Sequence, residues 1–378
     1  MKITFMVSGN IRSNFVYRSM ALARALHKLG HEVLIVAPKA DKYNNFTPET
    51  TRSIDGVSVL QPFQFVTKRM EINFLPYLFG ATMIALRKKS DFIYIYKPTP
   101  VNIVGFIAKL FKKTPIIVDM DDLGSEVMKI EGHPWFQRKF VEWSENFATK
   151  HADRLVVASS YLFNKYRRKF PEKLIHLMPN GVEADWFAPL IPSKEKQRVV
   201  FMGQINRKNI LEPLFNVFPA IIKQYPLAKA LIMGDGKDLE YFKKKTKELG
   251  IDSHITFTGW LALNAARSNL NAGDIGYNYM PDTITVKAAN NMKVSQYMAR
   301  GVVPLMSEVG DLPSMVDFGR VGYICKADNL EALKTALLRA LEDEDKMEKA
   351  QQASIFVAQQ FNWDHLAEDL CQWLIPEK

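Results

Sequence analysis

The sequence predicts an α/β protein that contains two Rossmann-like, doubly wound domains. At 378 residues, the chain is longer than one hydrophobic core usually supports. Apolar runs of strand length alternate with amphipathic helical segments, which is the pattern of parallel sheets with right-handed crossovers. This alternation begins at the N-terminus and starts again near residue 198. We therefore expect two domains of similar architecture.

The first half begins with a continuous apolar run from Ile3 to Val7, which is typical of a strand buried on both faces of a parallel sheet. In the helix that follows, Leu22 and Leu26 fall on one stripe, and Gly30 is expected to end it. Further strands are predicted at residues 31–37, 57–60, 92–96, 116–118 and 155–158.

The second half repeats the pattern, with strands predicted at residues 198–203, 230–233, 255–257, 275–277 and 302–306. The segment 180–196 is polar and contains prolines, so we place the domain boundary near residue 190. In such domains, ligands bind at the carboxyl ends of the parallel strands.

Composition restricts the function classes. An apolar content of 47% and a charged content of 24% fit an ordinary globular protein. The net charge of +10 favours an anionic partner such as a nucleotide or a membrane surface, although a basic enzyme without one remains an alternative. The cations are dispersed and no aromatic–basic motif stands out, so nucleic acid is not an expected partner.

Cellular location is predicted from cysteine use and from the absence of targeting signals. Cys325 and Cys371 have no metal-ligand spacing, so we expect free thiols in a reducing cytoplasm. Residues 1–7 read as a strand rather than a signal peptide. No uncharged apolar run reaches the roughly 18 residues of a spanning helix.

Glycine turns follow three of the predicted strands, and each is a candidate anion site or a plain structural turn. The first begins at Gly9, but no G-x-G-x-x-G follows, so a dinucleotide fingerprint is absent. The second, residues 203–209 (GQINRKN), has two cations that could hold a diphosphate. The third, residues 233–237 (MGDGK), could be either a ligand-binding turn or an ordinary β-to-α connection.

Residues 287–304 (KAANNMKVSQYMARGVVP) predict a polar loop, a helix that begins near Asn290 and a stop at Gly301. The first N–H groups of a helix have no partner within it, so its start is an anion site. Lys293 could reach a phosphate, and the Gln296 side chain offers both a hydrogen-bond donor and an acceptor. A solvated lysine and a polar helix-face residue are the alternatives.

Three carboxylates end the strand that contains Val118, in the run VDMDDL. Close carboxylates raise one another's pKa unless they face a cation or water. They are candidates for the reactive site, with helix capping by Asp122 as the alternative. Glu126, one turn on, could line the same site. His133 is a candidate for an acceptor-side loop, although an ordinary surface histidine fits as well.

Two apolar segments flanked by cations, residues 69–89 and 106–113, are candidate interfacial helices on an anionic membrane. Pro76 is expected to break the first of them. Buried core helices with solvated basic ends are the alternative. If the lipid interpretation holds, the protein works at the inner face of the plasma membrane.

Several motifs resemble those of the family 4 glycosyltransferases, in order and over nearly the whole chain. Residues 202–209 are similar to the family's V-G-R-L…K segment, with Gln204 in place of the arginine and Lys208 at the lysine. Residues 232–236 (IMGDG) and 255–260 (ITFTGW) are similar to I-V-G-D-G and V-x-F-x-G.

Upstream, residues 151–160 and 178–189 resemble A-D…V-x-x-S and I-P-N-G-V-D…F-x-P. The family's Glu-x7-Glu signature is incomplete. The segment YMARG after Gln296 matches its second half, but Ala288 and Gln296 stand where the two glutamates belong. In the acidic run, Asp121 replaces a family histidine that meets the donor sugar.

This resemblance implies the GT-B fold, in which two Rossmann-like domains face each other across a cleft. The domain at 1–190 would bind the acceptor, the domain at 191–360 the donor, and the helix in 361–378 would pack back on the first domain. The implied reaction is a retaining, metal-independent transfer of a hexose-type sugar from a UDP-, GDP- or ADP-sugar to a glycan or lipid-linked acceptor in polysaccharide or cell-envelope synthesis. No further cofactor is expected.

The resemblance also assigns site residues. The candidate catalytic residues are Asp121, Asp122 and Lys208. The candidate donor-binding residues are Gly9, Gly203, Arg207, Lys208, Gly234, Asp235, Gly259, Trp260, Asn290, Lys293 and Gln296. The candidate acceptor-binding residues are Arg12, Asn14, Glu126 and His133. The missing glutamates leave open a degenerate homologue that binds nucleotide or glycan, or scaffolds a partner, without catalysis. A GT-B sugar-nucleotide epimerase is a weaker alternative.

Overall fold

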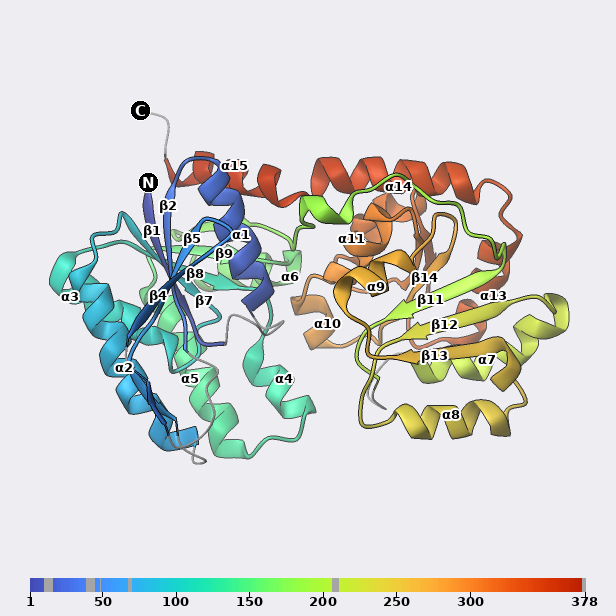
Figure 1. Cartoon of the computed structure of the whole chain (residues 1–378), viewed down its shortest axis with the longest axis horizontal. Helices are drawn as coiled ribbons and strands as arrows, with labels where there is room; N and C mark the ends of the chain where they lie inside the picture. The colour runs from blue at the N-terminus through green and yellow to red at the C-terminus, as the bar shows by residue number, and fades with distance from the viewer. Residues whose placement is uncertain (10–15, 39–44, 48, 67–69, 206–210, 376–378) are drawn as a thin grey trace. The chain divides into compact units, whose positions relative to one another are not determined.

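The structure, a computed structural model, describes residues 1–9, 16–38, 45–47, 49–66, 70–205 and 211–375. The chain forms two compact units (Figure 1). The first consists of Met1–Asn180 together with Trp363–Lys378, and the second of Gly181–Asn362. Each unit is a Rossmann-like arrangement of helices around a mainly parallel sheet, so the predicted fold class is confirmed.

The first unit is built on an eight-stranded sheet with the order β10-β9-β8-β7-β1-β2-β5-β4. All its neighbours pair in parallel except β4, which runs antiparallel to β5 at the edge. Its strands are β1 (Lys2–Val7), β2 (Glu32–Val36), β4 (Thr50–Ile54), β5 (Val57–Gln61), β7 (Phe92–Tyr96), β8 (Ile116–Met120), β9 (Arg154–Val157) and β10 (Leu174–Leu177). Two further strands, β3 (Asn45–Thr47) and β6 (Gln64–Val66), form a separate antiparallel pair.

Helices cover both faces of this sheet. They are α1 (Tyr17–Lys28), α2 (Met70–Arg87), α3 (Gly105–Lys112), α4 (Gly124–Ile130), α5 (Trp135–His151), α6 (Ser160–Lys169) and α15 (Trp363–Leu374). Alternate strand residues such as Phe5 and Val33 pack with α1 and α15 in one core. On the other face, α3 begins against Ile93 and Ile95 of β7.

Helix α15 belongs to the first unit, although its sequence follows the second. Its buried residues Trp363, Leu366 and Leu370 join the core that α1 covers. The chain leaves the first unit after Asn180 rather than near residue 190. The reason is local: the Val182 N–H donates to the Phe361 carbonyl at 2.6 Å, which already holds this segment in the second unit.

The second unit has a six-stranded parallel sheet with the order β13-β12-β11-β14-β15-β16. Its strands are β11 (Arg198–Met202), β12 (Lys229–Met233), β13 (Ile255–Gly259), β14 (Ile275–Asn278), β15 (Val303–Ser307) and β16 (Tyr323–Cys325). Its helices are α7 (Leu211–Gln224), α8 (Leu239–Glu248), α9 (Leu263–Ser268), α10 (Ile284–Ala288), α11 (Met292–Ala299), α12 (Leu312–Met315), α13 (Leu330–Glu342) and α14 (Lys346–Gln360).

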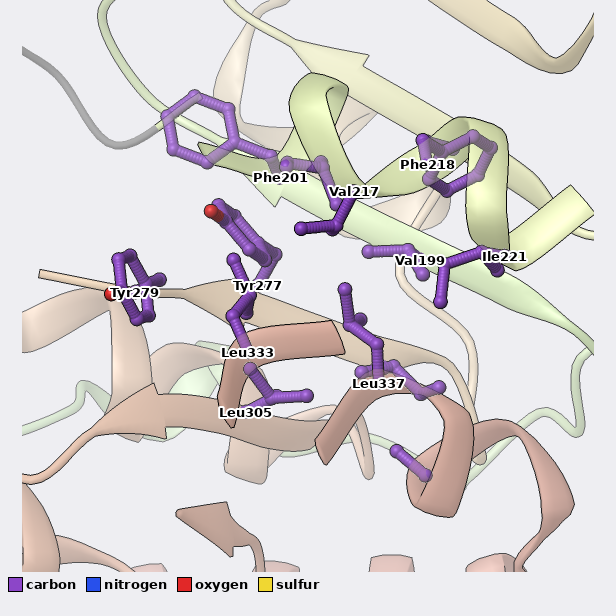
Figure 2. Packing of buried hydrophobic residues seen from close by; sticks show 14 of the residues in the cluster. Val199, Phe201, Val217, Phe218, Ile221, Tyr277, Tyr279, Leu305, Leu333 and Leu337 are labelled. Atoms are coloured by element: carbon purple, nitrogen blue, oxygen red, sulfur yellow. The ribbon is translucent and has the colours of Figure 1, made fainter. Parts of the chain in front are cut away.

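Two hydrophobic cores lie on the opposite faces of this sheet. Figure 2 shows one of them, where Phe201 and Tyr277 of the sheet meet Phe218 of α7 and Leu337 of α13. Residues of α11, α12 and α14 form the other core with intervening strand residues such as Val200. Burial on both faces explains why these strands read as continuous apolar runs.

Each sheet reverses its strand order at one point, and ligands of open α/β sheets bind outside the carboxyl ends of strands there. In the first unit, the reversal lies between β1 and β7. In the second unit, it lies between β11 and β14. The segments after these strands carry most of the predicted site residues.

Two local expectations are wrong. Pro76 does not break its segment, because α2 continues through it to Arg87. The buried side chains of Tyr77 and Ile84 anchor the helix beyond the proline, and the Tyr77 hydroxyl donates to the Val7 carbonyl at 3.0 Å. The polar loop expected before α11 contains the short helix α10, whose first turn is capped by Thr283.

Candidate active site

In the second unit, three glycine turns stack at the carboxyl ends of β11, β12 and β13. The Gly203 N–H donates to the Met233 carbonyl at 2.9 Å, and the Gly234 N–H donates to the Gly259 carbonyl at 3.0 Å. A β-carbon on Gly234 would lie 1.8 Å from the Gly203 carbonyl oxygen. These turns approach so closely that only glycine fits, which explains the glycine pattern in the sequence.

Lys293 lies against the first of these turns. A β-carbon on Gly203 would lie 2.4 Å from the Lys293 Nζ, and that Nζ sits 5.0 Å from the centre of the Phe201 ring. Burial lowers the pKa of the Lys293 ammonium to about 8. Among the described residues, no carboxylate pairs with it. A cation beside a glycine turn at the strand-order reversal, with no carboxylate partner in the part of the chain that the structure describes, is a candidate site for an anion.

Helix α11 holds Lys293 in this place. The Tyr297 hydroxyl accepts from the Met202 N–H at 2.8 Å, which fixes the helix to the end of β11. Asn291 caps the helix, because its Oδ1 accepts from the Lys293 N–H at 3.2 Å. The Asn291 Nδ2 donates to the Asn278 Oδ1 at 3.0 Å. The buried Asn278 Nδ2 has no acceptor in the described part of the chain.

The other donor-side candidates of this helix are less exposed. Gln296 and Asn290 are both buried, and the Asn290 Nδ2 lies 3.7 Å from the Met315 Sδ. Ala288, at the position of the first family glutamate, is fully buried. A carboxylate at that position would therefore have to enter the protein interior in this arrangement.

A cavity of about 290 Å³ adjoins the glycine turns and is lined by Gln204, Ile205, Asp235, Gly236 and Lys237. The Asp235 Oδ1 accepts from the Gly236 N–H at 2.7 Å, so this carboxylate shapes its own turn. Trp260, which follows the Gly259 turn, is 74% exposed. An exposed indole can stack on a flat ring such as a nucleobase.

In the first unit, the most buried carboxylate of the acidic run is Asp119. Its Oδ2 accepts from the Arg18 Nε at 2.8 Å and from the Tyr94 hydroxyl at 2.7 Å. Arg18 also donates to the Met178 and Pro179 carbonyls and to Asn180, at 2.8 to 3.0 Å. Burial raises the pKa of Asp119, and the Arg18 charge opposes this shift. This pair holds the last residues of the first unit against its sheet.

The other two carboxylates, Asp121 and Asp122, share one lysine. The Lys97 Nζ lies 2.7 Å from the Asp122 Oδ2 and 3.2 Å from the Asp121 Oδ1, and the Tyr96 hydroxyl donates to Asp121 at 2.7 Å. Burial and then the Asp121 charge raise the pKa of Asp122, while Lys97 lowers it. Helix capping by Asp122 is not observed, because α4 has no side-chain cap.

The predicted acceptor-side residues do not all join this cluster. Glu126 pairs with Lys129 of its own helix at 3.7 Å, and His133 lies 3.2 Å from Glu131 on the surface. Gly9 follows β1 at the strand-order reversal. Four further candidates, Arg12, Asn14, Arg207 and Lys208, lie outside the described residues.

Sequence reasoning missed Arg18, Tyr94, Tyr96 and Lys97 as partners of the acidic run. The signal available was the run Tyr94-Ile-Tyr-Lys97, in which polar groups end an apolar strand. These residues contact the acidic run because β7 and β8 are neighbours in the sheet. Strand order cannot be read directly from the sequence. The requirement that three close carboxylates face cations is met by Arg18 and Lys97.

Within the described residues, His, Cys, Asp and Glu side chains form no group of three or more that could hold a metal ion. In the same part of the chain, no helix has the length and apolar character needed to cross a bilayer.

Two family models match the chain. A glycosyl transferase 4-like domain matches residues 16–181, and a glycosyl transferases group 1 domain matches residues 196–343. The chain is also similar to the GDP-mannose-dependent alpha-(1-6)-phosphatidylinositol monomannoside mannosyltransferase of Mycobacterium tuberculosis, with 23% identity over 239 residues. That match spans 59% of this chain and 61% of the mycobacterial enzyme. The poly(glycerol-phosphate) alpha-glucosyltransferase of Bacillus subtilis is 21% identical over 190 residues, 47% of this chain and 26% of that protein.

Solved structures share the fold over the full length. Sucrose-phosphate synthase from Thermosynechococcus elongatus superposes with a TM-score of 0.77 and 16% identity, covering 99% of this chain and 98% of that one. Anabaena HepE in complex with UDP-glucose superposes with a TM-score of 0.73 and 14% identity, covering 99% of each chain. These are glycosyltransferase folds of the GT-B type, with two Rossmann-like domains.

Proposed function

The chain belongs to the GT4-type glycosyltransferases, and we propose that it transfers a hexose-type sugar from a nucleotide sugar to a glycan or lipid-linked acceptor. We further propose that the transfer retains the anomeric configuration and needs no metal ion. The second unit would bind the donor and the first unit the acceptor.

One observation carries this proposal: Lys293, which pairs with no carboxylate among the residues that the structure describes, lies beside the Gly203 turn at the strand-order reversal of the second unit. A departing nucleoside diphosphate needs fixed positive charge where its negative charge develops. Lys293 provides such a charge, and Arg207 and Lys208 are assigned the same role by the family motif. In this mechanism, these cations take the place of a divalent metal.

In the first unit, Asp121 and Asp122 would accept hydrogen bonds from hydroxyl groups of the reacting sugars. Lys97 bridges the two carboxylates, which lets both remain charged while they are close together. They would orient the substrates and stabilise positive charge on the reacting sugar ring. Arg18 and Asp119 would act indirectly, because they fix the end of the strand that carries these carboxylates.

The donor is proposed to carry a common hexose. The mycobacterial relative is named as GDP-mannose-dependent, and HepE was solved with UDP-glucose. The exposed Trp260 and the cavity beside Asp235 and Lys237 would receive the nucleobase.

Isothermal titration calorimetry with UDP, GDP and ADP tests donor binding. We expect one nucleotide to bind with submillimolar affinity and the Lys293→Met variant to bind it more weakly. Thermal shifts with the matching nucleotide sugars then identify the sugar, because ligand binding stabilises the native state. Failure of all three nucleotides to bind at millimolar concentration would overturn the proposal.

The incomplete glutamate pair supports one alternative, a homologue that binds nucleotide without transferring sugar. Turnover of a labelled donor separates the two functions, since only the enzyme releases nucleoside diphosphate. Gln296→Glu is the sharper restoration variant, because Glu at the fully buried position 288 would need a buried charge. A protein that is silent until Gln296→Glu restores turnover would favour the alternative.

A further inference from the structure

Two outer helices of the first unit, α3 and α5, expose large apolar side chains to solvent. On α3, Leu110 is 80% exposed and Phe111 is 74% exposed. On α5, Phe136 and Phe140 are each 57% exposed, and Trp143 is 50% exposed. Single exposed apolar residues need no explanation, but a contiguous aromatic set on neighbouring helices marks an interaction surface.

The aromatic residues of α5 form a stripe along one side of the helix. Phe136, Phe140, Trp143 and Phe147 are three or four residues apart, so they lie on one face. The rings of Phe140 and Trp143 stack with centroids 5.8 Å apart, and those of Trp143 and Phe147 with centroids 5.6 Å apart. Trp135, in the first turn, is 70% exposed and contacts Phe136 edge-on.

The stripe continues onto α3. The Phe147 ring meets the Phe106 ring of α3 edge-on at 5.3 Å, and the Lys109 Nζ donates to the His151 carbonyl at 3.1 Å. Helix α3 in turn packs beside α2, and the Lys112 Nζ donates to the Lys88 carbonyl at 2.9 Å. In Figure 1, these three helices are labelled within the first unit. The Phe147–Phe106 contact therefore connects the aromatic stripe of α5 to α3, the helix that carries the exposed Leu110 and Phe111.

Lysines border this surface where the helices end. Helix α3 ends in Lys112 and Lys113, and helix α5 has Lys150 in its last turn. In the described part of the chain, neither Lys113 nor Lys150 forms an ion pair with a carboxylate, whereas Lys109 of α3 pairs with Asp153. The acidic side chains Glu142 and Glu145 of α5 already have partners: Glu142 forms an ion pair with Lys139, and Glu145 accepts a hydrogen bond from the Ser125 hydroxyl.

We propose that this aromatic surface of α3 and α5, with its lysine border, docks on a bilayer that contains anionic lipid. Trp and Phe favour the boundary between lipid headgroups and acyl chains, and lysines favour an anionic headgroup layer. Lysines beside the aromatic rings match such a surface in charge, whereas a second copy of this face would place like charges together. The proposal differs from the sequence-based one, which placed the contact on residues 69–89 and 106–113 and did not include α5.

Vesicle co-sedimentation tests this docking without any donor or acceptor, so it stands or fails independently of the proposed reaction. We expect the protein to bind vesicles of phosphatidylcholine with 30% phosphatidylglycerol and to bind pure phosphatidylcholine much less. Adding salt should weaken the binding, because it screens the lysines. Lys113→Gln with Lys150→Gln should reduce the partition coefficient by about 30-fold.

The apolar contribution is tested with Phe136→Ser/Phe140→Ser, matched against Leu227→Ser/Ile355→Ser. Leu227 and Ile355 are as exposed as the two phenylalanines but lie in the second unit. We expect at least a tenfold loss of vesicle binding in the first variant and none in the second. Because all four residues are exposed, both variants should fold, and their circular dichroism melting curves check this.

The variant Trp135→Phe/Trp143→Phe tests the same surface by tryptophan fluorescence, without requiring that vesicle binding be lost. Brominated lipids quench tryptophans that enter the bilayer boundary. The protein should be quenched, and this variant should still sediment with vesicles but lose most of the quenching. Undiminished quenching in the variant, equal binding to neutral vesicles, or a dimer that dissociates when Phe136 and Phe140 are replaced would each overturn the proposal.

Discussion

Replacing Lys293 should weaken nucleotide binding in a way that depends on pH. In the structure, its ammonium lies beside the Gly203 turn without a carboxylate partner among the described residues. A charge-assisted hydrogen bond to a phosphate contributes roughly 1.5–3 kcal/mol. We therefore expect Lys293→Met to raise the Kd of the preferred nucleotide sugar by roughly 10- to 150-fold at pH 7.

The pH dependence follows from the lowered pKa of this lysine, which is about 8 in the free protein. An anion binds the charged form, so the apparent Kd rises as the lysine loses its proton above pH 8. The protonated fraction falls about tenfold between pH 7 and pH 9, and affinity should fall by the same factor. The diphosphate diester of a nucleotide sugar does not titrate in this range, so the change is assigned to the protein.

Calorimetric titrations at pH 7, 8 and 9 measure this effect. Lys293→Arg is the matched control, because its guanidinium stays charged throughout and should remove the pH dependence while keeping affinity at pH 9. Titration at pH 8.5 in two buffers with different ionisation enthalpies should also show proton uptake on binding by the unmodified protein. Equal affinities at pH 7 and pH 9, or an unaltered Kd in Lys293→Met, would refute the assignment of Lys293 to the phosphates.

Three further substitutions test the candidate site of each unit. Lys97→Met should lower the melting temperature at pH 7 and reduce turnover. Its effect on stability should shrink in acid, because the pKa of Asp122 is raised in the folded protein by burial, so protonation of this carboxyl group restores stability when its lysine is missing. Arg18→Met should destabilise the first unit by about 3–5 kcal/mol, because it leaves Asp119 buried and charged without its partner. Adding Asp119→Asn should recover part of this stability, as measured by urea unfolding. Gly234→Ala should destabilise the protein by about 3 kcal/mol, because the added β-carbon clashes with backbone. Gly132→Ala is the control: Gly132 also has a positive φ but has open space around it, so its replacement should cost only about 1 kcal/mol. Calorimetry measures both losses, and equal losses would contradict the stacked-turn geometry.

Much of the fold could be predicted because its strands are buried on both faces. Ile3–Val7 and Phe92–Tyr96 read as apolar runs for this reason, and they form β1 and β7 in the structure. The short edge elements were missed. Strand β10 (Leu174–Leu177) has no buried residue, so it carries no apolar run that would reveal it.

The candidate site was predictable where backbone geometry imposes a residue type. Gly203 and Gly234 must be glycines because their turns nearly touch, and this requirement is visible as a sequence pattern. The partners of the acidic run were not predictable. Arg18 reaches Asp119 from 101 residues away, through an approach that only the folded sheet creates.

The sequence by itself determined the fold class, the family and the positions of the buried central strands, since all three depend on local patterns of apolar, glycine and charged residues. Only the tertiary structure decided which charges are neutralised. Lys97 pairs with two carboxylates, while Lys293 lies beside a glycine turn and pairs with no carboxylate of the described residues. The physical reason is that an electrostatic interaction depends on distance and burial, and both are set by strand order rather than by position in the sequence.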